Sequence, residues 1–231
     1  YVSRSFETRS QAVGAGIIFL IDVGMKNDGK LTTAGAGSHW VYEHAIATYA
    51  LAEAYTFCLG LDINIPDLDK ITKKAGDIVM KGQSESGSWV YNYGKAGGDN
   101  SVGYWQLQAV KACHLTGLWD GESTFKKVYS KAREWFSKVQ GSDGTFGYRA
   151  DPKQSPALTG GGVLCLQMIG LRDSKAAKAG IDYVTESIKD QKLHLGQLYY
   201  HYYNAQAMIN HGGSEWKKYN KFFRDDLLDL Q

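Results

Sequence analysis

Cysteine is scarce in this chain, with three residues among 231. Cys58, Cys113 and Cys165 are too few and too widely spaced to form the disulfide framework of a small secreted protein. Three isolated cysteines also do not assign the protein to a cellular compartment. The localisation is therefore left open.

An excess of charge of one sign and a long apolar run are also missing. The formal net charge is +2, and the lysines and arginines are scattered among acidic residues, so no nucleic-acid partner is indicated. The longest apolar run, 17–21, is too short to span a bilayer, and we expect no transmembrane segment. The composition, with 43% hydrophobic and 13% aromatic residues, can bury a large core, and we expect residues 1–231 to form a single domain.

The two ends of the sequence lack the features of a complete chain. Position 1 is Tyr1 rather than methionine, and no secretory signal pattern follows it. The last residue, Gln231, is the residue type that introduces a Gly-aromatic turn elsewhere in the sequence. We therefore expect the domain to be a fragment of a longer polypeptide.

What the sequence does contain is a repeated turn signal. Residues 27–31, 85–89 and 142–146 each place a polar residue, a glycine and an apolar or aromatic residue in the same order. Gly29, Gly87 and Gly144 lie about 58 and 57 positions apart, and Gly196 follows about 52 positions later. A fixed period of this size predicts stacked supersecondary units.

The segments between the turns have helical periodicity, and strand signals are absent. One set, around 11–23, 68–79, 128–139, 177–188 and 216–227, carries a single apolar stripe and predicts outer helices with one wet face. The alternating set, 45–61, 102–119, 157–171 and 198–209, is apolar or small nearly all round and predicts inner helices covered on all sides. Nine helices result, and an all-α fold follows. Because an open solenoid would leave one side of the inner helices in water, the pattern favours a ring.

Several polar residues and glycines agree with these helix boundaries. Ser174 can cap an outer helix, and one of the residues 99–101 can cap an inner one. Ser155 followed by Pro156 marks the start of the third inner helix. Glycines at 60, 117 and 170 fall where inner helices should end.

Specific motifs give the sequence a family resemblance. Residues 131–136, followed by Gln140 and 143–146, resemble the QW repeat of squalene and hopene cyclases, and Gln83 with Gly87 and Trp89 is a second match. Residues 144–148 are similar to the Gly-Gly-Phe-Gly turn of protein prenyltransferase beta subunits. Residues 42–48 and 200–208 look like the prenyltransferase and squalene-oxidase repeat proteins of large bacterial polypeptides. The resemblance implies an α/α toroid, whose ring is either complete or incomplete.

Four residues of the repeat have a structural interpretation. A glutamine at the end of an outer helix can bond exposed backbone groups of the neighbouring unit, and the aromatic residue of the turn can pack against that unit. We expect this role for Gln83, Trp89, Gln140 and Phe146.

The catalytic motifs of the resembled families are missing from this sequence. It has no Asp-x-Asp-Asp run, which supplies the acid of the cyclases, and no Asp-x-Cys, which holds zinc in the protein prenyltransferases. We therefore expect a repeat domain that binds a ligand or a protein partner and holds no cofactor. The alternative is an enzyme of isoprenoid cyclase or transferase type with an aromatic-lined central cavity, so whether the chain is catalytic is left open.

A candidate binding site lies at the predicted starts of the inner helices. Parallel inner helices would gather their N-termini, with free N–H groups and partial positive charge, at one end of a ring. Such a mouth could hold a hydrophobic or isoprenoid-like molecule with an anionic head, or it could be filled by its own aromatic side chains. His44 and His201 could act there as acid or base or could be hydrogen-bonded core residues. The candidate residues are Trp40, Tyr42, His44, Tyr104, Trp105, Tyr200, His201 and Tyr202.

A zinc site is a less favoured alternative. Lanthionine cyclases, which are also α/α toroids, bind zinc with one cysteine and a later Cys-His pair, and Cys58 with Cys113 and His114 has a loosely similar spacing. Against it, small cysteines often fill helix cores. We therefore expect no metal.

Overall fold

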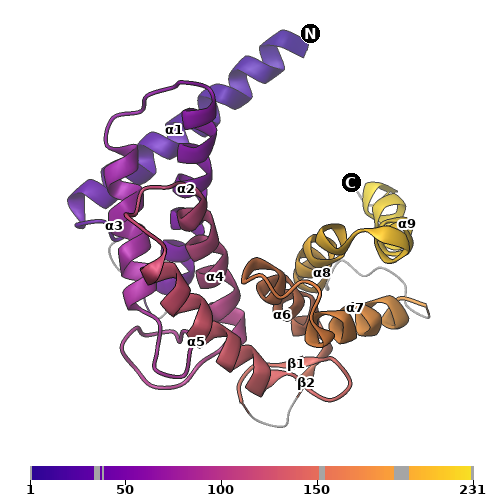
Figure 1. Ribbon diagram of the computed structural model, residues 1–231. Coiled ribbons are helices and arrows are strands. Elements are labelled where there is room, and N and C mark those ends of the chain that lie inside the picture. Colours follow the sequence, from indigo (N-terminus) through magenta and orange to yellow (C-terminus); the bar gives the residue numbers. More distant parts are fainter. Residues whose placement is uncertain (1, 34–36, 38, 151–153, 190–197, 230–231) are drawn as a thin grey trace. The chain divides into compact units, whose positions relative to one another are not determined.

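The computed structural model describes residues 2–33, 37, 39–150, 154–189 and 198–229. Within them the chain forms nine α-helices and two two-residue strands, which Figure 1 labels. The helices and strands are α1 (Val2–Lys26), α2 (Trp40–Gly60), α3 (Leu68–Lys81), α4 (Asn100–Leu115), α5 (Ser123–Val139), β1 (Phe146–Gly147), β2 (Gln154–Ser155), α6 (Pro156–Met168), α7 (Lys175–Ser187), α8 (Leu198–His211) and α9 (Gly213–Asp229).

The all-α prediction is confirmed, and each predicted helix corresponds to one in the structure. The odd-numbered helices match the outer set and the even-numbered helices match the inner set. The sequence did not predict β1 and β2, which pair antiparallel through Phe146 and Ser155. Two residues per strand are too few to produce an alternating pattern that could be recognised in the sequence.

Local signals at the helix ends explain where these helices start and stop. The Ser174 hydroxyl accepts a hydrogen bond from the Ala177 N–H at 3.1 Å and caps α7. The α6 helix begins at Pro156, as predicted. Gly117 and Gly170, with φ of 71° and 81°, lie just beyond α4 and α6 in the left-handed region.

The repeated turn requires glycine for two reasons. Gly29, Gly87 and Gly144 have φ of 90°, 97° and 88°. A Cβ on these residues would lie 2.5 Å from Lys74 Cβ, 2.0 Å from Lys131 O and 2.4 Å from Ala179 O, respectively. Each glycine therefore lies directly against an outer helix, in α3, α5 and α7. The predicted fourth copy, at Gly196, lies outside the described residues.

The residues that accompany these glycines are also placed consistently. Two positions after each glycine, Leu31, Trp89 and Phe146 are all buried, with exposed fractions of 2%, 1% and 0%. The Gln83 side chain donates a hydrogen bond to Val128 O in α5 at 3.0 Å. Correspondingly, Gln140 donates to Ala176 O in α7 at 2.8 Å and to Gly144 O at 3.2 Å. Both glutamines thus join the end of one outer helix to the next outer helix.

The chain packs as two compact units. Unit 1 comprises Tyr1–Gln83, Tyr91–Lys95 and Trp105–Val128, and unit 2 comprises Ser84–Val90, Ala96–Tyr104 and Tyr129–Gln231. In unit 1, α1 packs against α2 and α3 (Figure 1). The core of these helices contains Ile21, Leu31, Ala47, Leu51, Leu68, Ile71 and Ala75.

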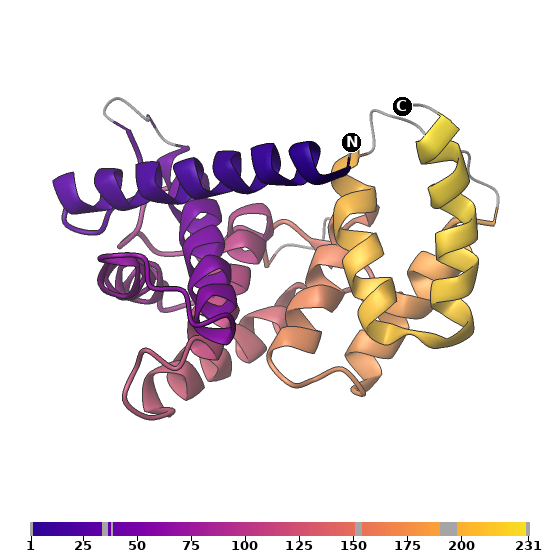
Figure 2. The same cartoon turned by 90° about the horizontal axis from the view of Figure 1, so that it is seen from above.

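In unit 2, α6 packs against α7 and α8, and α8 packs against α9 (Figure 2). Every residue of α6 from Leu158 to Leu166 is buried. Close approach explains the glycines of this helix, because a Cβ at Gly160 would lie 2.6 Å from the Asn204 backbone nitrogen, and one at Gly162 would lie 2.4 Å from the Phe146 ring. The apolar, small composition of α6 therefore reflects burial on all sides, as predicted.

The same expectation is wrong for α2. Ile46, Phe57 and Leu59 are 40%, 72% and 63% exposed, although α2 is as apolar as the other inner helices. Among the described residues of unit 1, α2 packs mainly against α1 and α3, and these contacts leave the three side chains exposed.

None of the helices in the described part of the chain combines the length and the hydropathy needed to cross a membrane.

Candidate functional site

The eight residues predicted to form one cavity mouth divide between the two units. Trp40, Tyr42, His44 and Trp105 belong to unit 1, and Tyr104, Tyr200, His201 and Tyr202 belong to unit 2. Each set has its surroundings within its own unit, and the single mouth stays a prediction.

His44 is a hydrogen-bonded core residue in unit 1. Its Nδ1 accepts the Leu31 N–H at 2.9 Å, so the proton is on Nε2, which lies 3.2 Å from Ala75 O. The side chain is fully buried, and this burial lowers the pKa of His44 to about 4. The neutral His44 imidazole therefore connects α2 to the repeated turn, through Leu31, and to α3, through Ala75.

An aromatic cluster lies next to His44 at the start of α2. It consists of Trp40 and Tyr42 from α2 and Tyr91 and Tyr93 from a later loop, and all four are half-buried. The Trp40 and Tyr93 rings meet edge to face, with centroids 4.9 Å apart, and the Tyr42 and Tyr91 rings do the same at 5.6 Å. The hydroxyl groups of Tyr42 and Tyr91 lie 3.2 Å apart and share a hydrogen bond.

Polar and charged groups surround the aromatic cluster. The Lys30 ammonium lies 3.9 Å from the centroid of the Trp40 ring, which is a cation–π contact. On the same helix, the Glu43 carboxylate accepts a hydrogen bond from the Thr32 hydroxyl at 2.5 Å. The Tyr93 hydroxyl donates to the Gln106 side chain, whose amide nitrogen donates to Val41 O at 2.9 Å. These contacts fix the rings in place while part of each remains accessible.

The unit 2 residues have more varied surroundings. Tyr104 is fully buried and donates its hydroxyl to Leu158 O at 2.8 Å, and burial raises the pKa of Tyr104. Tyr200 is buried, and its hydroxyl pairs with the Ser187 hydroxyl at 2.8 Å. Tyr202 is 42% exposed.

His201, like His44, is buried beside the next outer helix. Its Nδ1 lies 2.8 Å from the Tyr219 hydroxyl in α9, and burial lowers the pKa of His201. No described residue forms a hydrogen bond with its Nε2. The ring packs against the Phe222 ring, with centroids 5.7 Å apart.

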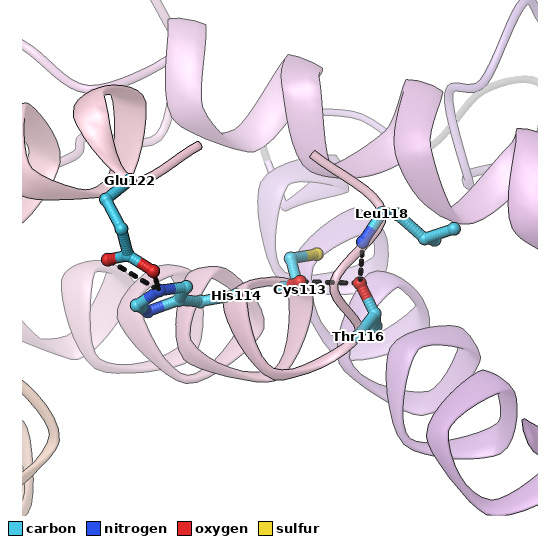
Figure 3. A network of polar contacts seen from close by, with 5 residues as sticks. All are labelled: Cys113, His114, Thr116, Leu118 and Glu122. Atoms are coloured by element: carbon cyan, nitrogen blue, oxygen red, sulfur yellow. Dashed lines mark hydrogen bonds and ion pairs between the residues drawn. The ribbon is translucent and has the colours of Figure 1, made fainter. Parts of the chain in front are cut away.

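The structure does not bring together the three residues of the alternative zinc site. The Cys113 sulfur points away from the His114 ring (Figure 3) and lies against Gly76, where an added Cβ would be 2.8 Å from it. The His114 imidazole instead pairs with the Glu122 carboxylate at 3.0 and 3.1 Å. Across the described residues, no group of three histidine, cysteine, aspartate or glutamate side chains is arranged to hold a metal ion.

The buried cysteines are also poor nucleophiles. Burial raises the pKa of Cys113 to about 12 and raises that of Cys165 well above its usual range.

The Cys113 carbonyl accepts a hydrogen bond from the Thr116 hydroxyl at 2.7 Å, and this hydroxyl accepts one from the Leu118 N–H (Figure 3). The two contacts shape the turn that ends α4.

Sequence reasoning missed three residues of this region: Lys30, Tyr91 and Tyr93. Tyr91 and Tyr93 lie in the loop before α4, outside the helical segments that carry the repeat pattern. Their signal is the pair of tyrosines in Tyr91-Asn92-Tyr93, which follows directly on the repeated turn.

No protein-family model matches the chain, and neither do any curated proteins or solved structures. The resemblance to cyclase and prenyltransferase repeats is therefore carried by the motifs alone.

Proposed function

We propose that this chain is a non-catalytic helical-repeat module, built on the α/α arrangement of the toroid families, that binds a protein partner through the aromatic cluster of unit 1. The observation that carries the proposal is the pair of fixed, half-exposed edge-to-face contacts, Trp40 with Tyr93 and Tyr42 with Tyr91. Tryptophan and tyrosine are the residues most often responsible for binding energy at protein interfaces.

The surroundings of the cluster support a binding role. The Lys30 ammonium lies over the Trp40 ring, and Glu43, which bonds Thr32, follows Tyr42 in α2, so charged residues of both signs accompany the apolar rings. Because the rings are already held by contacts with each other and with Gln106, little side-chain entropy is lost when a partner covers them.

The interactions of His44 and of the two buried cysteines support binding rather than catalysis. Both ring nitrogens of His44 are used by the backbone of the repeat, and the His44 imidazole is fully buried. The Cys113 and Cys165 thiols are buried and protonated at neutral pH.

A peptide-display selection on the immobilised chain tests the proposal. Selected peptides should bind Tyr42→Ala at least about tenfold more weakly than wild type, which corresponds to about 1.4 kcal/mol. The matched control is Tyr148→Ala, because Tyr148 is 46% exposed in unit 2 and lies outside the cluster. Circular dichroism should show that both variants fold.

Two results would contradict the proposal. One is peptide binding that Tyr42→Ala does not weaken. The other is an isoprenoid that co-purifies in stoichiometric amount and is lost in Tyr42→Ala, as measured by native mass spectrometry. The second result would instead favour the small-molecule alternative, and raised melting temperatures with isoprenoid diphosphates would corroborate it.

A further inference from the structure

Lys30 departs from the pattern of the repeated turn. The residue that directly follows the repeat glycine is Lys30 in the first copy, Ser88 in the second and Thr145 in the third. Ser88 and Thr145 are small and buried, with exposed fractions of 1% and 2%, whereas Lys30 is half-buried. Because two copies of the turn form with a small hydroxyl residue at this position, the turn itself does not require a lysine there.

The backbone on both sides of Lys30 is held by the repeat. Gly29 lies against α3, where an added Cβ would be 2.5 Å from a side-chain carbon of that helix. The Leu31 N–H donates to His44 Nδ1 at 2.9 Å. The Lys30 ammonium itself lies 3.9 Å from the centroid of the Trp40 ring. A charge positioned in this way loses less conformational freedom on binding than the charge of a free surface side chain does.

The positive charge of Lys30 has no ion-pair partner among the residues that the structure describes. The Glu43 carboxylate of α2 accepts the Thr32 hydroxyl at 2.5 Å instead. Burial is the main cause of the low pKa of His44, and the charge of Lys30 contributes to it. The start of α2 therefore lies in the positive field of Lys30.

This arrangement favours an anionic group on the partner. A lysine ammonium has three N–H donors, and contact with the Trp40 ring does not use all of them. A carboxylate can pair with Lys30 while the ammonium stays over the ring. A second cation would instead be repelled by Lys30 or would have to displace it.

We infer that the partner segment that covers the aromatic cluster is acidic, and that it presents an aspartate or glutamate side chain to the Lys30 ammonium next to an apolar side chain on the rings. This inference rests on the proposed function and names the chemistry of the partner.

Two peptide libraries test the inference. Both have random apolar and aromatic positions around one fixed central residue, which is glutamate in one library and lysine in the other. Display selection on the intact chain should enrich binders from the glutamate library and none from the lysine library. The tightest peptide is then synthesised with glutamate and with glutamine at the fixed position, and both forms are titrated by fluorescence anisotropy.

The expected result is a coupling between the peptide carboxylate and Lys30. Wild type should bind the glutamate form about fivefold more tightly than the glutamine form. Lys30→Met, which keeps a long apolar side chain on the Trp40 ring, should bind the two forms equally, and Lys30→Arg should retain the preference. The matched control is Lys127→Met, which removes the same charge from an exposed position of α5 in unit 1 and should behave as wild type.

The outcomes separate this inference from the proposed function. Equal binding of the two peptide forms to wild type, with binding still weakened in Tyr42→Ala, would overturn the inference and leave the proposed function in place. Enrichment from the lysine library, with tighter binding to Lys30→Met, would overturn it in favour of a cationic partner. If neither library yields a binder, both proposals fail. Circular dichroism should show that the variants fold, and the comparison of the two peptide forms on wild type does not depend on them.

Discussion

Replacing Gly87 with alanine tests whether the repeat glycine is needed for contact as well as for conformation. At φ of 97°, an alanine is strained by about 1–2 kcal/mol. Its Cβ would also lie 2.0 Å from Lys131 O, which is backbone of α5 and cannot rotate away. Such overlap typically costs a further 1–3 kcal/mol, at the scale of about one overpacked group. We therefore expect Gly87→Ala to lower the free energy of unfolding by about 3 kcal/mol.

Gly97→Ala separates the two contributions. Gly97 lies in the same unit with a similar φ of 101°, but the nearest atom to an added Cβ is 3.9 Å away, which is an ordinary contact. Its substitution should cost only the conformational part, about 1–2 kcal/mol. Urea unfolding followed by circular dichroism measures both variants, and the m-value shows whether the same transition is compared.

The contact argument predicts that Gly87→Ala is the more destabilising variant by about 2 kcal/mol. Equal losses for the two variants would show that the close approach to α5 has no energetic consequence. A Gly87→Ala variant as stable as wild type would refute both parts of the reasoning.

Three further predictions concern other parts of the repeat. The pKa of His44 is lowered to about 4 in the fold, so the unfolded chain binds the His44 proton more tightly than the folded chain does. The free energy of unfolding should therefore fall by up to about 3 kcal/mol as the pH decreases from about 6.5 to 4. Urea unfolding of His44→Gln should show a flatter pH dependence. Ser174→Ala removes the cap of α7 and should lower the unfolding free energy by about 1 kcal/mol in the same assay, whereas Ser174→Asp should largely retain it. In native protein, a thiol reagent should modify the half-buried Cys58 and should reach Cys113 only after unfolding, and rapid native labelling of Cys113 in a peptide map would contradict its burial.

The helices could be predicted because their signals are local. The apolar stripe of 128–139 has the period of a helix with one buried face, and the uncharged segment 157–171 has the composition of a helix buried on all sides. Ser174 and Pro156 mark helix starts through contacts within one turn of chain. The repeat itself was visible because Gly29, Gly87 and Gly144 hold the same left-handed turn position in their units.

The aromatic cluster was predicted only in part. Trp40 and Tyr42 lie at the start of α2, one of the helix starts where the sequence predicted candidate binding residues. Tyr91 and Tyr93 join them from a loop that is distant in the sequence, and no periodic pattern indicates which helix a loop will contact.

The sequence by itself determined the helical class, the alternation of helices that carry one apolar stripe with helices that lack a polar face, and the positions of the repeat glycines, because these depend on periodicity and on backbone conformation within a few residues. Tertiary structure decided that His44 bonds Leu31 and Ala75, and that Cys113 and His114 point apart. It also decided that α6 is covered while one side of α2 is not. The two helices have similarly apolar sequences but differ in exposure, because burial depends on which neighbours pack against a helix. An apolar sequence shows only that a helix can be covered.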